Sequence, residues 1–335
     1  MLHGSRVPSN ATETDHLGAA IVRRQRKVAP QAAWRKADLA NAAVLAAFLL
    51  PSWLLPERLW APICRAIVRI PALRRRKDIK LNVDSIAAAL SGTSQRTAEA
   101  IALDLKAKAY ELLMQDLRAW RPGGWRPNVT LEGDGNLKSA LAPGKGVILW
   151  VAPFVFNSVP TKAALCRGGH RVSHLSSPRH GFSRTRFATA FLNRIRSIPE
   201  DRYLSQRIVF DQHAPATAMR RMMRALKAGE VVTIVATSVE GSDLIQGPLF
   251  GGCLLVANGA PRLAALSGAP LLPVFTVREP EGAFRTVVDT AIDMASRRTS
   301  DERCAAAVIE YLNRSEHWIR MFPEQWSVWG EWRKA

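Results

Sequence analysis

One segment of the chain combines a histidine with residues that bind anions. His180 comes a few residues after a predicted strand over 171–175, and its neighbours are basic or hydroxylic. Imidazole titrates near neutral pH and acts as a general base, while arginine binds phosphate or carboxylate through paired hydrogen bonds. We therefore predict His180 as a catalytic base; the alternative is a solvated loop histidine among surface arginines. The predicted substrate-binding residues beside it are Arg179, Ser183, Arg184 and Arg186.

A second candidate region is the stretch GKGVILWVAPFVFNS at 144–158, which predicts a turn, a buried strand over 147–151 and a loop opening toward a helix. In open α/β sheets, sites collect at the carboxyl ends of the strands, so we expect this loop at the same edge as His180. We predict Ser158 as a catalytic residue, a nucleophile or an oxyanion donor, unless it only shapes the groove. Asn157 is predicted to bind substrate.

A carboxylate follows another predicted strand, 231–236, and is expected at the same edge of the sheet. Glu240 is predicted to orient a base or to bind an acceptor amine; the alternative is an ordinary carboxylate in a turn. For the other histidines we favour positions without a catalytic role. His174 lies inside a predicted strand, His213 in a loop, and His317 beside the tryptophans near the end of the chain.

Several short pieces of sequence follow one another in a characteristic order between about residues 128 and 332. They are VTLEG at 129–133, GKG at 144–146, ALKAG at 225–229, GPLFG at 247–251, APRLA at 260–264, GAPLLPVF at 268–275 and PEQW at 323–326. Their order and spacing resemble the lipid A late acyltransferases, a branch of the lysophospholipid acyltransferase-like superfamily. Within GPLFG, we assign Phe250 to substrate binding.

The chain departs from this family at its catalytic motif, which is a histidine, four residues, and then an aspartate or glutamate. The resemblance places Pro153 and Ser158 at these two positions, and Thr237 where the family carries a later aspartate. Proline cannot accept a proton, and a serine hydroxyl orients an imidazole less well than a carboxylate does. The resemblance therefore implies the fold, and it leaves the catalytic base to be found elsewhere.

The resemblance also implies a reaction. A fatty acyl group would move from an acyl thioester, carried on acyl carrier protein or on coenzyme A, to a hydroxyl or amine of a lipid or glycolipid acceptor. The location would be the cytoplasmic face of the bacterial inner membrane, with no metal and no bound cofactor. The alternative function is that of a catalytically inactive relative that binds lipid or a partner enzyme.

Charge and cysteine content limit the classes of partner. The net charge is +19, and the excess is uneven: residues 1–80 hold 15 Lys/Arg against 5 Asp/Glu, and residues 167–207 hold nine Arg against two acids. Such an excess indicates an anionic membrane surface or an acidic protein partner. No nucleic-acid-binding motif is present, so we expect no nucleic-acid partner. The four cysteines form no CxxC pair, which argues against a structural zinc site.

Composition divides the chain into three parts. We predict a disordered basic arm over 1–36, a membrane-associated helical region over 37–125 and an α/β acyltransferase-like domain over 126–335. The apolar run 40–55 is shorter than the roughly 20 residues that cross a bilayer and is flanked by basic residues. It predicts a shallow, monotopic membrane anchor; the alternative is a buried core helix. Residues 84–120 are expected to be helical, with an N-terminal cap region at Ser94 to Glu99.

From residue 128 onward, predicted strands and helices alternate. The expected strands are 129–132, 147–151, 171–175, 231–236 and 270–277. The expected helices are 137–141, 161–166, 184–196, 216–228, 260–267 and 303–314. This alternation predicts an α/β fold with a mixed, mostly parallel sheet and helices on both faces.

Overall fold

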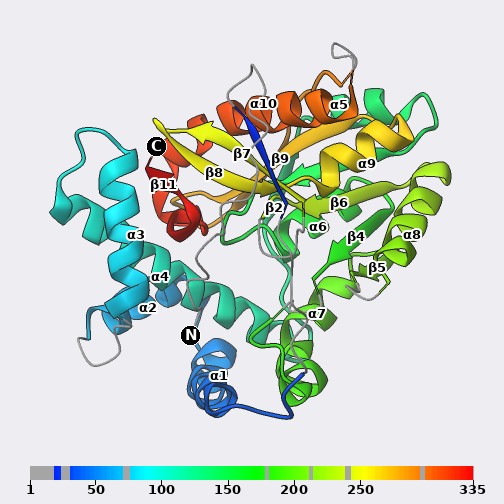
Figure 1. Ribbon diagram of the computed structural model, residues 1–335. Helices are drawn as coiled ribbons and strands as arrows, with labels where there is room; N and C mark the ends of the chain where they lie inside the picture. The colour runs from blue at the N-terminus through cyan, green and yellow to red at the C-terminus, as the bar shows by residue number, and fades with distance from the viewer. Residues whose placement is uncertain are drawn as a thin grey trace.

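A seven-stranded sheet forms the centre of the protein (Figure 1). The computed structural model describes residues 19–23, 31–70, 76–177, 181–210, 214–237, 243–294 and 299–334. In spatial order the strands are β2 (Val129–Glu132), β10 (Phe284–Val288), β9 (Leu271–Arg278), β3 (Val147–Val151), β6 (Val231–Val235), β4 (Val172–Ser176) and β5 (Gln206–Val209). All pairings from β9 to β5 are parallel, and β10 runs antiparallel to β9. The predicted mixed, mostly parallel sheet is confirmed.

Helices cover both faces of this sheet. One face carries α5 (Asp134–Leu141) and α6 (Val159–Arg167), and the other carries α8 (Pro215–Lys227), α9 (Gly259–Ser267) and α10 (Ser300–Met321). The central strand β3 is buried along its whole length because its residues alternate between the two layers. Leu149 packs in one cluster with Leu137 and Leu165, while Trp150 stacks on Tyr311 at 4.3 Å between ring centroids.

A second, antiparallel sheet lies beside the first and was not predicted from the sequence. Its order is β1 (Ala20–Arg23), β7 (Asp243–Leu249), β8 (Gly252–Ala257) and β11 (Arg333–Lys334). The prediction of a disordered arm over 1–36 is wrong for Ala20–Arg23, which form strand β1. Its short apolar run pairs with the edge of β7, and Ala19 and Ala20 are buried there. Backbone pairing and burial therefore order a segment that local composition assigned to disorder.

The region before the sheet is helical, as predicted. It contains α1 (Lys36–Leu54), the short η1 (Glu57–Leu59), α2 (Trp60–Arg69), α3 (Arg76–Ala89) and α4 (Gln95–Arg118). The helical stretch expected over 84–120 is present as two helices, because Gly92 has a φ of +84° and ends the first, and the predicted cap region is confirmed. Ser94 then caps α4 by accepting a hydrogen bond from the backbone N–H of Thr97.

Helix α1 lies against this region along one stripe only. Leu45 and Phe48 are buried in a small separate core, and Phe48 stacks on Tyr110 of α4 at 5.2 Å. By length and composition, α1 is the one helix within the described ranges apolar enough to cross a membrane, yet only 22% of its most apolar window is buried. Most of its apolar surface is therefore left open.

The basic segment after β4 differs in detail from the predicted helix over 184–196. It forms a π-helical stretch, η3 (Ala188–Leu192), followed by α7 (Arg194–Asp201). The chain closes with η4 (Pro323–Gln325) and η5 (Trp329–Glu331), which lie between α10 and β11. In Figure 1, α1 and the segment that holds η3 lie side by side at the bottom of the molecule, and backbone hydrogen bonds from Arg186 and Phe187 to residues 32 and 33 join them.

The turn before β3 yields a stability prediction. Gly146 has a φ of +66°, and a Cβ there would lie 2.7 Å from Leu226 Cα and 2.8 Å from the Glu230 carbonyl oxygen. We expect Gly146→Ala to lower the free energy of unfolding by more than about 4 kcal/mol, because the clash is with backbone atoms that cannot rotate away. Gly144→Ala is the control, since its φ is +75° but its Cβ would meet nothing within 4 Å.

In the control, the free energy of unfolding should fall by only about 1–2 kcal/mol, the cost of placing a residue with a side chain in the left-handed region. Chemical unfolding of both variants, followed by circular dichroism, measures the difference. Equal losses for the two variants would contradict the close approach of β3 and α8.

Candidate active site

The loop after β3 is held in place by the end of the chain. The backbone N–H of Val155 donates to the Gln325 carbonyl oxygen at 2.8 Å, and Phe154 pairs with Trp326 in an antiparallel bridge. The Ser327 backbone N–H and hydroxyl both donate to the Pro153 carbonyl oxygen, at 3.0 and 2.5 Å. The PEQW sequence near the terminus therefore has a structural purpose, which is to bind the backbone of the loop that carries Pro153 and Ser158.

Ser158 lies at the start of α6 and points to a buried carboxylate. Its hydroxyl donates to Oε1 of Glu200, a residue of α7 with no exposed surface. The other oxygen, Oε2, accepts from the Arg207 guanidinium at 2.8 Å and lies 3.5 Å from the Lys162 ammonium. A hydroxyl and two cations thus surround one carboxylate at the carboxyl edge of the sheet.

The electrostatics of this cluster are set by burial. Burial of the Lys162 side chain lowers the pKa of its ammonium, an effect that Glu200 opposes and Arg207 reinforces. Burial also acts against the charged form of Arg207, but the carboxylates of Glu200 and Asp201 outweigh it and raise the pKa of that guanidinium. Because an unpaired buried carboxylate would be costly, these contacts hold α6, α7 and β5 in one arrangement.

The cluster includes Ser158, the position to which the resemblance assigns a motif carboxylate. The Glu200 carboxylate lies directly against the Ser158 hydroxyl. The contact fixes the direction of the Ser158 hydroxyl toward the interior. Only 6% of Ser158 is exposed.

The other predicted residues of this region have internal partners. The Asn157 amide donates to the Ala152 carbonyl oxygen at 3.2 Å and closes the loop on itself. Phe250 is buried at the turn between β7 and β8, where it stacks on Trp329 and lies under the Arg320 guanidinium at 4.8 Å. Its φ of +52° is unusual for a residue with a side chain. Phe250 therefore packs within the protein, unlike the substrate-binding residue that the sequence suggested.

Ser183 connects two segments of the chain. Its hydroxyl donates to Oδ1 of Asp38 at 2.6 Å, and the Thr185 hydroxyl donates to Oδ2 at 2.8 Å. Burial alone would raise the pKa of Asp38, but these hydrogen bonds lower it. The partner of Ser183 is thus the first turn of α1, whereas we had predicted a substrate. Arg184 and Arg186, on either side of Thr185, are exposed.

Three predicted residues, Arg179, His180 and Glu240, lie outside the described residues, as does His213. The strands that precede them end at the predicted edge, since β4 and β6 run parallel to β3. His174 is confirmed as a structural histidine, since its Nδ1 lies 2.9 Å from the Thr233 hydroxyl inside the sheet. His317 is exposed, with its ring edge-on to the neighbouring Trp318 at 5.9 Å between ring centroids.

A second buried ion pair closes the neighbouring part of the edge. Arg278, the last residue of β9, pairs with the buried Glu111 of α4, and its guanidinium lies 5.8 Å from the ring centroid of Phe156. The Gln325 side chain accepts from the Arg278 backbone N–H and donates to its carbonyl oxygen, both at 2.8 Å. Among the residues that the structure places, no group of His, Cys, Asp or Glu could hold a metal ion.

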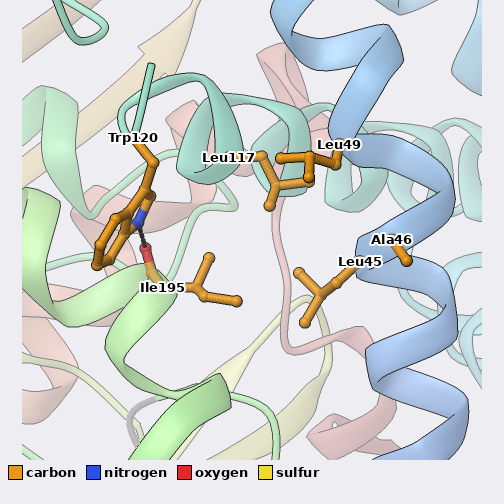
Figure 2. Close-up of a pocket in the computed structure, with 6 residues that line it drawn as sticks. All are labelled: Leu45, Ala46, Leu49, Leu117, Trp120 and Ile195. Atoms are coloured by element: carbon orange, nitrogen blue, oxygen red, sulfur yellow. Dashed lines mark hydrogen bonds between the residues drawn. The ribbon is translucent and has the colours of Figure 1, made fainter. Parts of the chain in front are cut away.

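An apolar groove lies between α1 and the start of α7 (Figure 2). Its volume is about 280 Å³. The lining residues, Leu45, Ala46, Leu49, Leu117, Trp120 and Ile195, come from α1, from the end of α4 and from α7. The Trp120 indole N–H donates to the Ile195 carbonyl oxygen at 3.0 Å and fixes one wall. Ile195 precedes Glu200 on the same helix by about 7.5 Å along the helix axis, so one helix connects the groove with the buried cluster.

The sequence analysis missed Lys162, Glu200 and Arg207. Charged residues are exposed in most proteins, and nothing in their local pattern marks these as buried. The one available signal is the spacing of Ser158 and Lys162, which are four residues apart and therefore share a helix face.

The buried cluster yields a second prediction. We expect Lys162→Met to lower the free energy of unfolding by about 3–5 kcal/mol, because it leaves the buried Glu200 without one of its cations. The control, Lys138→Met, removes a lysine whose side chain is 67% exposed and which pairs with Asp134 at 2.5 Å. It should cost less than about 1 kcal/mol.

The pH dependence separates this effect from a simple packing change. The folded pKa of Lys162 lies below that of an unfolded lysine, about 10.4, so the unfolded chain binds more protons between the two values. Stability therefore rises with pH in that window, and Lys162→Met should remove this rise. Unfolding curves measured across that range test it; an unchanged pH slope in the variant would contradict the assignment.

Comparison with known proteins finds a family match over part of the chain. The family model for bacterial lipid A biosynthesis acyltransferases matches residues 187–331. A similar solved structure is the 1-acyl-sn-glycerophosphate (LPA) acyltransferase PlsC from Thermotoga maritima, with 10% identity, coverage of 79% of this chain and 98% of that chain, and a TM-score of 0.36. A search of curated proteins gives no match. The chain is thus similar to this family over residues 187–331, a region that includes Glu200, Arg207 and the PEQW sequence.

Proposed function

We propose that the protein is a membrane-associated acyltransferase that moves a fatty acyl group from an acyl thioester to a hydroxyl or amine of a lipid or glycolipid acceptor. The family match supports acyl transfer, and one structural observation supports an apolar substrate. That observation is the groove between α1, α4 and α7, whose lining is apolar throughout. The helix α7 that forms one wall of it also carries Glu200, the partner of Ser158.

The size of the groove favours one hydrocarbon chain. Its volume of about 280 Å³ is slightly below the range of about 300–1,000 Å³ typical of sites for drug-sized ligands. A groove of this size accepts part of an acyl chain, and its apolar lining offers no hydrogen-bond partners for a sugar headgroup. Each methylene buried in it gains about 0.8 kcal/mol, so several methylenes provide useful affinity without any polar contact.

The proposed location is the cytoplasmic face of the bacterial inner membrane. Helix α1 supports an interfacial position over a spanning one, because it is tied along its side to the rest of the protein. The Trp53 indole N–H donates to the Leu117 carbonyl oxygen, and the Arg118 guanidinium donates to the carbonyl oxygens of Trp53 and Leu55. A helix held in this way is suited to lie in the plane of the interface.

The proposed acyl donor is acyl carrier protein or coenzyme A bearing the acyl group. Acyl carrier proteins are acidic, and the net charge of +19 favours such a partner, as it favours an anionic lipid surface. The proposed acceptor is a lipid. The charge does not imply a nucleic acid, because no motif for one is present.

We propose His180 as the catalytic base, with Glu240 as the residue that orients it or binds the acceptor. Both follow strands whose carboxyl ends lie at the edge that holds Ser158. Arg179 is proposed to bind an anionic group of the substrate. The proposed part of Ser158 is limited to shaping the site, because its hydroxyl already donates to Glu200.

An inactive, lipid-binding relative is the second candidate function. Its support is the closed state of the motif loop, in which Pro153 accepts two hydrogen bonds from Ser327 and Phe154 is fully enclosed. Under this function the groove would hold an acyl chain without turnover. The two functions differ in whether a new acylated lipid appears.

Lipid mass spectrometry separates these functions. Cells with and without the gene are compared, and the deletion strain is complemented with the parent, with His180→Ala or with Ser158→Ala. We expect an acylated lipid that disappears on deletion and is restored by the parent. His180→Ala should lower its rate of formation by about 10²–10⁴-fold, as loss of a general base does.

Ser158→Ala should stay within about tenfold of the parent, since a buried hydroxyl that faces a carboxylate is not expected to react. No lipid difference on deletion would contradict acyl transfer and favour the inactive relative. A full-rate His180→Ala variant would leave acyl transfer in place and reject His180 as the base.

The groove yields a separate prediction, for purified protein in mixed micelles. Ala46 and Ala47 are both exposed on α1, but only Ala46 lines the groove. Ala46→Phe should fill part of the volume and lower turnover of a long-chain acyl thioester at least about tenfold more than that of a short-chain one, because lost chain burial costs about 0.8 kcal/mol per methylene. Ala47→Phe is the matched control and should keep the ratio of the parent. Identical ratios in the two variants would place the acyl chain elsewhere.

A further inference from the structure

We propose that α1 and the segment 184–194 together form one surface that binds the anionic headgroup layer of a phospholipid bilayer. The inference rests on the membrane association proposed above, and it does not depend on acyl transfer. It assigns lipid binding to a particular segment in the middle of the chain, in addition to the membrane anchor predicted over 40–55.

The two segments are joined firmly enough to act as one surface. The backbone N–H groups of Arg186 and Phe187 donate to the carbonyl oxygens of Ala32 and Ala33, each at 3.0 Å. The Gln31 amide donates to the Arg184 carbonyl oxygen at 2.8 Å. Below them, Asp38 accepts from two hydroxyls of the segment, and Leu192 packs in the same small core as Leu45. A membrane that holds α1 therefore also meets residues 184–194.

Large apolar side chains point outward from both segments. In the mid-chain segment, Phe191 is 65% exposed and Phe187 36% exposed, and their rings lie 5.4 Å apart. Trp34 and Leu39 are exposed next to them at the start of α1, and Leu50 and Leu54 further along the helix. Clustered exposed aromatic residues on a polar protein mark an interaction surface, and aromatic rings are favoured at the level of lipid headgroups.

Charge decides which partner fits this surface. Arg186 and Arg194 are exposed among the phenylalanines, and Arg35 and Lys36 are exposed at the start of α1. The sequence holds no acid over 181–199 and only Asp38 over 31–56, and Asp38 is buried. Arginines interspersed with exposed apolar side chains suit a layer of lipid phosphates above acyl chains. An apolar protein partner would not require these cations.

Flotation of the full-length chain with vesicles tests the charge component. The vesicles contain either three parts phosphatidylglycerol to seven parts phosphatidylcholine, or phosphatidylcholine alone. Arg186→Gln/Arg194→Gln should bind the anionic vesicles about 30-fold more weakly than the parent does. Arg220→Gln/Arg224→Gln removes the same charge from exposed positions on α8, which lies away from α1 in Figure 1, and should stay within about twofold.

The apolar component is tested with a second pair of variants. Phe187→Ser/Phe191→Ser should weaken binding to both kinds of vesicle by about tenfold or more, since the lost burial of apolar area does not depend on lipid charge. The matched control is Leu266→Ser/Met321→Ser, whose side chains are 62% and 46% exposed on α9 and α10. Circular dichroism must show that all four variants fold as the parent does.

The outcomes separate this surface from the proposed reaction. Selective loss of vesicle binding in the two surface variants supports the inference, whether or not an acylated product is ever found. Parental binding by either surface variant overturns it, even if acyl transfer is intact. Failure of the parent itself to bind anionic vesicles also overturns it and would favour a protein partner for the exposed phenylalanines.

Discussion

The arrangement of the site depends on one buried carboxylate. Glu200 has no exposed surface, and a bare carboxylate in that environment would cost several kcal/mol. In place of water, three groups hydrogen-bond or pair with this carboxylate: the Ser158 hydroxyl, the Lys162 ammonium and the Arg207 guanidinium. These three groups come from the start of α6, its second turn and β5, so the need to satisfy one residue of α7 determines where the other elements can lie.

Helix α7 connects the buried Glu200 with the groove and with the surface of the protein. Glu200 near its end is fixed in the interior, and Ile195 near its start forms a wall of the apolar groove. Before α7, the π-helical stretch η3 places Ala188 and Leu192 in the core shared with α1, and its exposed face carries Phe187 and Phe191 at the surface. A short stretch of chain thus connects the buried edge of the sheet, the groove and the proposed lipid-binding surface.

The sequence predicted those parts of the fold in which local pattern and burial agree. The strands β3 and β6 are short apolar runs between turns, and both were predicted within a residue of their true ends. Strand β7 was missed because Gly247 and Pro248 interrupt its pattern, and its backbone is satisfied only by pairing with distant β1 and β8. In the same way, the hydrogen bonds of β1 come from a strand more than two hundred residues away in sequence.

In the candidate site too, the sequence predicted the location of the loop but not the partners of its side chains. The loop that holds Asn157 and Ser158 was expected at the carboxyl edge of the sheet, and it lies there. The partners of these residues could not be read locally, since Glu200 is 42 residues from Ser158 and looks like any helical glutamate. Ser183 was assigned to a substrate because its neighbours are arginines, but Asp38, 145 residues earlier, accepts its hydrogen bond. Long-range pairs of this kind follow from the topology and not from composition.

The loop after β3 has its polar groups occupied by distant parts of the chain. The Pro153 carbonyl oxygen accepts a hydrogen bond from the Ser327 hydroxyl, which anchors the end of the chain. The Ser158 hydroxyl donates to Glu200, whose carboxylate also contacts Lys162 and Arg207. The parallel neighbours of β3 are β6 and β9, and the end of β9 is occupied by the ion pair of Arg278 with Glu111. The proposed base follows β4, which lies beyond β6, so it would belong to the same carboxyl edge as the loop.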